Sequence, residues 1–128
     1  MNTRQIGNLG ETAVCRFLEK HGYRITARNF TCRSGEIDII AENNDTIAFV
    51  EVKSRKPDSM VTDAEAVDTS KKRKIFRTAA QYSFRHPLMK QPRFDIAEIT
   101  LINDKPYSIK YYKNAFDMSD SGIMLAMG

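Results

Sequence analysis

Two short apolar segments on either side of a polar turn constrain the fold of this chain most strongly. Residues 35–42 and 46–53 mix apolar and charged side chains, and Asn-Asn-Asp-Thr occupies positions 43–46 between them. Side chains of these turn residues hydrogen-bond their own backbone, and Asn tolerates left-handed dihedral angles. The sequence therefore predicts a β-hairpin over residues 35–53.

The predicted hairpin has one charged face of unusual composition. A turn centred between positions 44 and 45 pairs Asp38 with Glu51 and Glu36 with Lys53. Carboxylates with Cβ atoms about 5 Å apart oppose folding unless something offsets their repulsion. A divalent cation does so, and hard oxygen ligands suit Mg²⁺ or Mn²⁺. We expect Asp38 and Glu51 to bind this cation.

Lys53 and Glu36 complete the predicted charged face. Lys53 lies two residues from Glu51 on the same strand face, where its ammonium group can position or activate a water or neutralise charge on a phosphorane-like transition state. We expect Glu36 to support Lys53 across the hairpin. A solvated strand face explains any one of these residues by itself, but four in one register favour a metal-dependent site.

The opposite face of the predicted hairpin is apolar. The same register pairs Ile37 with Val52 and Ile39 with Val50. A slip of one residue in the pairing would turn these side chains to the other face. The register is therefore strongly specified, and these four residues predict a core face.

The net charge of +4 is distributed unevenly. Residues 36–68 contain nine acidic and three basic side chains, whereas residues 69–113 contain three acidic and eleven basic ones. An acidic centre flanked by basic segments is what a metal-dependent nuclease needs, because carboxylates hold the cation while the flanks attract phosphate. An ordinary mixed-charge surface remains the alternative explanation.

Composition indicates one soluble domain. The chain has 128 residues, of which 41% are hydrophobic and 28% charged, which is ordinary for a globular protein with its own core. It has no apolar run of membrane-spanning length and no signal-peptide pattern, so we expect no membrane association. Cys15 and Cys32 lack the spacing of a zinc site and favour a reducing, cytoplasmic location.

The apolar periodicity predicts an α/β domain with the order helix, strand, strand, strand, helix, strand, strand. We expect the domain to span residues 1–113 and residues 114–128 to form a flexible tail or a docking segment. The predicted helices span residues 7–21 and 70–85, and the predicted outer strands span residues 23–30, 94–102 and 107–112. A polar segment that could cover a substrate spans residues 56–69.

Several short motifs resemble those of a known protein family. The chain resembles the YraN-like family of uncharacterised bacterial proteins, within the PD-(D/E)XK superfamily of restriction-endonuclease-like and Holliday-junction resolvase-like nucleases. The similarity spans roughly residues 7–100. The motifs that carry it are Gly10-Glu11, Gly22-Tyr23, Arg28-Asn29, Gly35-Glu36-Ile37-Asp38, Phe49-Val50-Glu51-Val52-Lys53-Ser54-Arg55 and Arg93-Phe94-Asp95.

The resemblance implies a restriction-endonuclease-like core with a mixed central sheet of about five strands, and Mg²⁺- or Mn²⁺-dependent phosphodiester cleavage. It also implies that Glu11 of the first helix completes the metal site. Favourable placement of an acid near a helix N-terminus is the alternative explanation for Glu11. One departure is Ile37, which replaces the superfamily's proline before the first aspartate and removes no chemistry.

Basic side chains supply candidate nucleic-acid contacts. Arg55, two residues beyond Lys53, is the best candidate for clamping a phosphate, and Arg33 is a second candidate. The remaining candidates lie on the outer face of the second helix and would bind backbone phosphate without reading sequence. The competing interpretation is that this helix face is only solvated. The candidates on the second helix are Lys71, Lys74, Arg77, Thr78 and Gln81.

Three functions remain open from the sequence. We expect a metal-dependent endonuclease acting on structured, branched DNA rather than RNA. A four-way junction would imply a homodimer, because it requires two symmetric incisions, whereas a flap or a nick would not. The alternatives are a nucleic-acid-binding module that serves a partner protein through its basic helix and Met-rich tail, and a structural protein with a charged hairpin.

Overall fold

The computed structural model of the chain describes residues 3–55, 69–119 and 121–128. It confirms the predicted α/β fold, with two helices and a five-stranded mixed sheet. The elements are α1 (Thr3–Lys20), β1 (Arg24–Cys32), β2 (Gly35–Glu42), β3 (Thr46–Arg55), α2 (Thr69–Arg85), β4 (Gln91–Ile102) and β5 (Lys105–Phe116).

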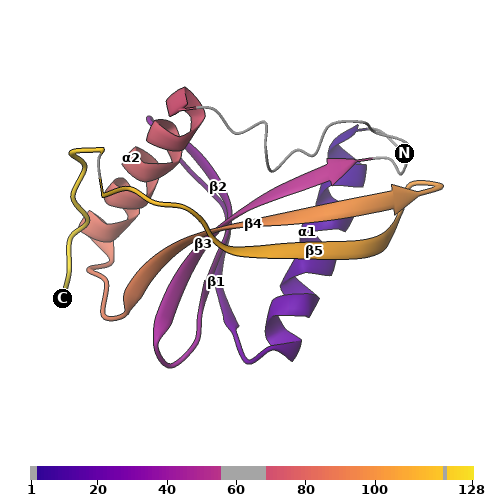
Figure 1. Cartoon of the computed structure of the whole chain (residues 1–128), viewed down its shortest axis with the longest axis horizontal. Helices are drawn as coiled ribbons and strands as arrows, with labels where there is room; N and C mark the ends of the chain where they lie inside the picture. The colour runs from indigo at the N-terminus through magenta and orange to yellow at the C-terminus, as the bar shows by residue number, and fades with distance from the viewer. Residues whose placement is uncertain (1–2, 56–68, 120) are drawn as a thin grey trace.

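The strands follow one another in the sheet in the order β1-β2-β3-β4-β5. Only β3 and β4 are parallel, and the other neighbouring strands are antiparallel. Parallel neighbours need a crossover connection, and α2 lies within the connection between β3 and β4. The carboxyl ends of β3 and β4 therefore share one end of the sheet, which is also where α1 begins (Figure 1).

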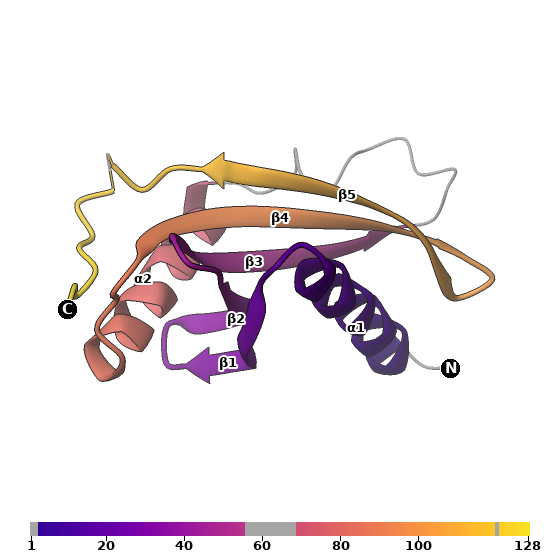
Figure 2. The same cartoon turned by 90° about the horizontal axis from the view of Figure 1, so that it is seen from below.

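The helices pack on opposite faces of the sheet, and β3 shows this most clearly. Ile47 and Phe49 pack in a core with α2, whereas Ala48 and Val50 pack in a second core with α1. Successive side chains of a strand point to opposite faces, so β3 is buried on both. Figure 2 shows α2 and α1 on either side of the β1 and β2 strands.

The first helix begins earlier than predicted and ends where expected. It starts at Thr3 rather than residue 7 and stops at Lys20. Gly22 has a φ of 86°, which glycine adopts at no steric cost, and the amide of Tyr23 donates to the carbonyl of Leu18. Within this helix, Leu9 is 37% exposed, while Cys15 is buried in the core.

Two glycines of α1 make a matched test of how closely the helix approaches the sheet. A Cβ on Gly10 would lie 3.0 Å from Ser54 Oγ and 3.3 Å from Ile99 Cδ1, whereas nothing lies within 4 Å of one on Gly7. Gly10→Ala is expected to lower the free energy of unfolding by about 1–2 kcal/mol through overpacking. Gly7→Ala is expected to raise it by about 0.5–1 kcal/mol. Urea denaturation measures both, and equal effects would contradict this packing.

The second helix matches its prediction closely. It runs from Thr69 to Arg85, and one face of the helix is buried. Because the apolar spacing of this segment fits a helical period, one face alone meets the sheet. The buried set comprises Ile75, Phe76, Ala79, Tyr82 and Ser83, together with Thr78 and Ala80.

The last two strands are longer than predicted and extend past the expected domain boundary at residue 113. Asn103 and Asp104 form the turn with φ values of 52° and 61°, and β5 continues to the buried Phe116. Beyond it, Leu88 donates its amide to the carbonyl of Ala126 at 2.9 Å and accepts from the amide of Gly128 at 2.7 Å. The C-terminal residues thus pack beside α2, and their flexibility remains a prediction.

Two further predictions from the sequence concern the polar segment 56–69 and membrane association. The predicted polar segment 56–69 lies outside the described residues except for Thr69, which opens α2. Within the part of the chain that the structure describes, neither helix is both long and apolar enough to cross a lipid bilayer.

Candidate functional site

The predicted hairpin register is correct close to the turn and ends sooner than expected. Asn43 Oδ1 accepts from the amides of Asp45 and Thr46, at 3.0 and 2.8 Å. The strands pair in the predicted register, but only as far as Ile39 and Val50. Because the turn side chain satisfies local backbone amides, it holds the strands in this register.

Asp38 lies at the point where the pairing of β2 with β3 stops. Its Oδ2 accepts the amide of Val52 at 2.8 Å. The predicted backbone pairing of Asp38 with Glu51 is therefore wrong, because a carboxylate takes an amide that a backbone carbonyl would otherwise accept. The hydrogen bond fixes the Asp38 carboxylate at the edge of β3, one residue from Glu51.

The predicted apolar face needs a related correction. Ile39, Val50 and Val52 pack in the core beneath α1, but Ile37 packs in the other core, with α2. The prediction of a single core face assumed that β2 and β3 pair as far as residue 37. Since the β2–β3 pairing ends at Ile39, Ile37 is free to join the second core.

Asp38 experiences an unfavourable electrostatic environment. Burial, and then the charge of Glu51, raise the pKa of Asp38 to about 7. The hydrogen bond from Val52 opposes this shift, and Glu11 and Glu36 add smaller repulsions. The carboxylate charge is thus stabilised by one amide and destabilised by three neighbouring acids, which is the environment that a cation would relieve.

Two lysines meet at Glu51. Lys53 Nζ and Lys71 Nζ lie 3.2 and 3.3 Å from the same Oε1 atom, and the Glu51 side chain is only 13% exposed. Burial, and then the adjacent Lys71, lower the pKa of Lys53. Two ammonium groups supply the charge of one divalent cation, so the carboxylate pair is compensated here by lysines.

The donor set fits a hard divalent cation in part. Asp38 and Glu51 supply carboxylate oxygens, and Mg²⁺ commonly uses one or two carboxylates together with waters and substrate phosphate. Within residues 3–55, 69–119 and 121–128, no three His, Cys, Asp or Glu side chains form a ready-made metal centre. A cation would therefore rely on water or substrate for its remaining ligands.

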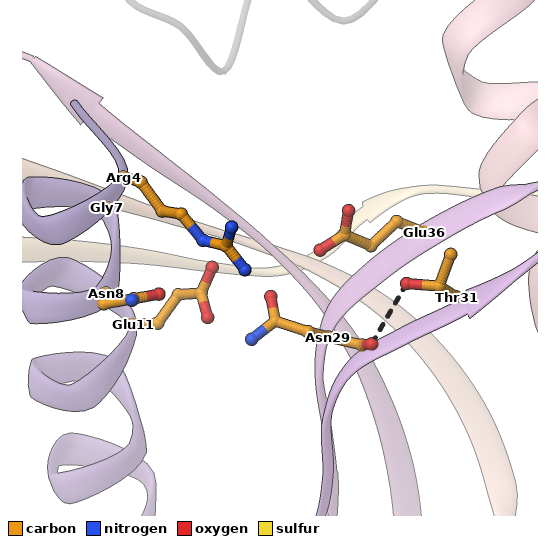
Figure 3. Close-up of a pocket in the computed structure, with 7 residues that line it drawn as sticks. All are labelled: Arg4, Gly7, Asn8, Glu11, Asn29, Thr31 and Glu36. Carbon is orange, nitrogen blue, oxygen red and sulfur yellow. Dashed lines mark hydrogen bonds between the residues drawn. The ribbon is translucent and has the colours of Figure 1, made fainter.

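Glu11 approaches from α1 and lines a polar cleft between that helix and the β1–β2 hairpin (Figure 3). Burial raises the pKa of Glu11, and Arg28 forms an ion pair with it, with Nη2 3.6 Å from Oε1. The cleft has a volume of about 570 Å³ and is lined by Arg4, Gly7, Asn8, Glu11, Asn29, Thr31 and Glu36. Glu11 therefore lies within electrostatic reach of Asp38 without joining it in a cluster.

Glu36 belongs to the same cleft. It pairs with Thr31 of β1 and is exposed, and Figure 3 shows its carboxylate directed across the cleft toward α1. The predicted pairing of Glu36 with Lys53 is wrong, because β2 and β3 no longer pair at this level and the Lys53 ammonium contacts Glu51.

Arg55 has a partner that the sequence interpretation missed. Its Nε lies 3.0 Å from Oε1 of Glu98, a β4 side chain that is only 1% exposed. Glu98 is the β4 neighbour of Lys53 in the parallel ladder. Glu98 follows Phe94 and Ile96 at a spacing of two residues, which was a usable signal that the three side chains share one face of the sheet.

The remaining predicted nucleic-acid contacts lie on two elements, the turn between β1 and β2 and the helix α2. Arg33 is exposed in the turn between β1 and β2, and that turn touches α2, because a Cβ on Gly35 would lie 3.2 Å from Thr78 Oγ1. Three predicted α2 contacts face solvent, whereas Lys71 reaches Glu51. The exposed three are Lys74, Arg77 and Gln81. Thr78 is fully buried and its hydroxyl donates to the carbonyl of Lys74 at 2.7 Å, so its prediction as a nucleic-acid contact is wrong.

Asp38→Asn is expected to stabilise the protein when no divalent cation is bound. The carboxyl pKa rises from 3.8 to about 7 on folding, so its contribution to stability is complete below pH 3.8 and is lost as the pH rises toward 7. An asparagine at this position does not titrate, so the variant does not lose this stability as the pH rises. Chemical denaturation in EDTA at pH 8 should show a gain on the order of 2 kcal/mol, which should disappear near pH 4. A loss at pH 8 would contradict the repulsion.

Comparison with known proteins places these residues in a family. The profile of the uncharacterised protein family UPF0102 matches residues 10–99. A UPF0102 protein of Clostridium acetobutylicum is 44% identical over 117 residues, which cover 90% of this chain and 96% of that protein. A UPF0102 protein of Myxococcus xanthus is 36% identical over 115 residues, which cover 89% and 90% of the two chains. The chain belongs to the uncharacterised protein family UPF0102.

Proposed function

We propose that this protein is a Mg²⁺- or Mn²⁺-dependent endonuclease that hydrolyses phosphodiester bonds in structured DNA. The observation that carries the proposal is the electrostatic interaction of the Asp38 carboxylate with that of Glu51, whose charge, after burial, raises the pKa of Asp38. The amide of Val52 fixes the Asp38 carboxylate, and two lysines neutralise Glu51. Carboxylates held together beside a lysine suit metal-assisted phosphoryl transfer.

Each residue has a defined part in this reaction. Asp38 and Glu51 would hold the cation, which would supply Lewis-acid polarisation of the phosphate and stabilisation of the charge that develops during attack. Lys53 orients the attacking water toward phosphorus, and burial, followed by the adjacent Lys71, lowers its pKa, which favours proton exchange with that water. The water oxygen bonds to phosphorus as one ester P–O bond breaks, and the departing oxygen takes up a proton.

Glu11 and Glu36 contribute from the cleft beside α1. Glu11 affects the charge on Asp38 and would support a bound cation from α1. Glu36 acts through the field that it imposes on Asp38, not through contact with Lys53. Both roles place the reacting phosphate at the junction of α1, β2 and β3.

The basic surface determines the class of substrate. Arg33 and the exposed α2 residues Lys74, Arg77 and Gln81 track backbone phosphate, so binding depends on salt and on nucleic-acid shape. Arg55, held by Glu98, faces the phosphate beside the cut. A four-way junction substrate requires two copies of the chain for paired incisions. The reaction belongs in the cytoplasm, where the free thiols of Cys15 and Cys32 stay reduced.

Cleavage of a labelled panel tests the proposal. The panel contains a four-way junction, a flap, a single strand and a plain duplex, each with Mg²⁺, Mn²⁺ or EDTA. Metal-dependent cutting that Asp38→Ala and Lys53→Ala abolish is the expected result. Cutting that survives both substitutions would place the active site elsewhere, and binding without cutting would end the nuclease proposal.

A second function is favoured by the lysine pair on Glu51. Since Lys53 and Lys71 neutralise this carboxylate without a metal, the same fold could serve as a nucleic-acid-binding module that works with a partner protein. Exposed Met124 and Met127 of the C-terminal segment offer a contact for such a partner. Thermal stabilisation by Mn²⁺ that Asp38→Ala removes favours the enzyme, and its absence favours the module.

A further inference from the structure

The register of the sheet places part of β5 in line with the candidate site. Glu51 of β3 neighbours Ile96 of β4, which pairs with Tyr112 of β5. One step along the strands, Lys53 neighbours Glu98, which pairs with Lys110. Side chains of neighbouring residues point to the same sheet face. Tyr112 and Lys110 therefore lie on the face of the sheet that carries Glu51 and Lys53.

This part of β5 is open to solvent. Tyr112 is 38% exposed and Lys110 is exposed, whereas the alternate residues Ile109 and Tyr111 pack toward the α1 core. Adjacent strands are about 4.8 Å apart, so Tyr112 lies about 10 Å from Glu51 across the sheet. Figure 1 shows that β4 and β5 extend away from α2, past the end of the sheet that α2 covers.

The charge of β5 is suited to a polyanion. From Lys105 to Phe116 the strand contains three lysines and no acidic residue. Among the strands that the structure describes, it lies at the edge of the sheet and is hydrogen-bonded to β4 alone. An edge strand that carries lysines resists pairing with another strand, so its exposed surface suits phosphate better than a second copy of this chain.

We propose that Lys110 and Tyr112 bind a nucleic-acid strand that flanks the phosphodiester at Asp38 and Glu51. Tyr112 stacks on a base and Lys110 neutralises a neighbouring phosphate, as in other surfaces that hold unpaired strands. A stacked strand rises about 3.4 Å per nucleotide, so the contact lies about three nucleotides from the cut. This inference rests on the proposed function, because it takes the carboxylate site as the cleavage site.

The experiment measures binding without cleavage. A fluorescein-labelled flap substrate with an unpaired arm is titrated with wild-type protein in EDTA, followed by fluorescence anisotropy at several salt concentrations. The variants are Tyr112→Ala, Tyr112→Phe, Lys110→Ala and Lys20→Ala. Lys20 is an exposed lysine at the end of α1 and controls for the loss of one charge. Circular dichroism melting establishes that each variant is folded.

Tyr112→Ala is expected to weaken binding about tenfold, and Tyr112→Phe is expected to bind as wild type, because stacking requires the ring. Lys110→Ala should lower the slope of log affinity against log salt by about 0.7–0.9, while Lys20→Ala leaves it unchanged. Wild-type affinity in folded Tyr112→Ala, or equal slopes for both lysine variants, would overturn the inference.

The same samples separate this inference from the nuclease proposal. If wild-type protein binds the flap but fails to cut it with any metal, the nuclease proposal fails, and the Tyr112→Ala affinity still decides the strand contact. If wild-type protein cuts and Tyr112→Ala binds and cuts equally well, the strand contact fails and the nuclease proposal stands.

Discussion

Asp38→Asn is expected to reduce metal-dependent cleavage by at least about a thousandfold. The side chain keeps an oxygen that can accept the Val52 amide, so the hydrogen bond at the point where β2 and β3 stop pairing is preserved. It loses the negative charge that makes it a ligand for Mg²⁺. Single-turnover cleavage of the preferred substrate at saturating protein measures the chemical step without contributions from weakened binding.

A second carboxylate provides the matched control. Asp104 is exposed in the turn between β4 and β5, and its φ of 61° suits asparagine. Asp104→Asn removes the same charge and should cleave at the wild-type rate. A fall of less than about tenfold in Asp38→Asn, or an equal fall in both variants, would show that Asp38 is not a metal ligand.

Lys53→Met should cause a loss similar to that of Asp38→Asn while leaving metal binding intact. The lysine contacts Glu51 but is not a ligand, so its removal disturbs water activation and leaves the carboxylate pair. The same single-turnover assay, run across a Mn²⁺ series, separates the two defects. Loss of metal affinity in Lys53→Met would assign the lysine a structural role.

Asp95→Ala is expected to lower the free energy of unfolding by about 3–5 kcal/mol, because it leaves a charged arginine without its carboxylate partner. Asp95 is fully buried and accepts hydrogen bonds from Arg93 at 2.8 Å and from the Tyr111 hydroxyl at 2.6 Å. It also accepts the Asn114 amide at 2.9 Å, and Arg93 reaches the Tyr23 hydroxyl at 2.7 Å.

The double variant Arg93→Met/Asp95→Leu tests the reason for this effect. Replacing both partners with apolar groups removes the unpaired charge, so it should be markedly less destabilising than Asp95→Ala. Urea denaturation at neutral pH measures both variants. If Asp95→Ala costs less than about 1 kcal/mol, the network does not hold β4 to β5.

The fold was largely predictable because local signals agreed with tertiary packing. Asn43 specified its turn through its own side chain, and the apolar stripe of α2 matched a helical period at Ile75, Phe76 and Ala79. The exceptions lie at ends of elements. Helix α1 begins earlier than its stripe suggests, and β5 continues to Phe116 because an aromatic core receives it.

The candidate site was predictable in its residue types but not in its detailed contacts. The pattern of Asp38, Glu51 and Lys53 followed from strand periodicity alone. The end of the ladder at Ile39 did not, because it depends on the Asp38 side chain capturing the Val52 amide. Lys71 also reaches Glu51 only through the docking of α2, which no local pattern of the chain specifies.

The role of Arg93 and Asp95 shows a further limit of motif reading. The motif Arg93-Phe94-Asp95 was part of the family resemblance, yet it carried no indication of what the charges do. In the structure these charges face one another on the α1 side of the sheet, and Phe94 packs in the α2 core. Their contacts give the motif a structural role, distinct from the carboxylates at Asp38 and Glu51.

Binding of Mn²⁺ by isothermal titration calorimetry is the most direct test of a divalent cation held by Asp38 and Glu51. Wild-type protein should bind Mn²⁺ with a measurable affinity that Asp38→Asn and Glu51→Gln each abolish, while Asp104→Asn binds as wild type. Absence of binding to the wild-type protein, or equal binding by all four proteins, would contradict a cation at the carboxylate pair and with it the nuclease mechanism.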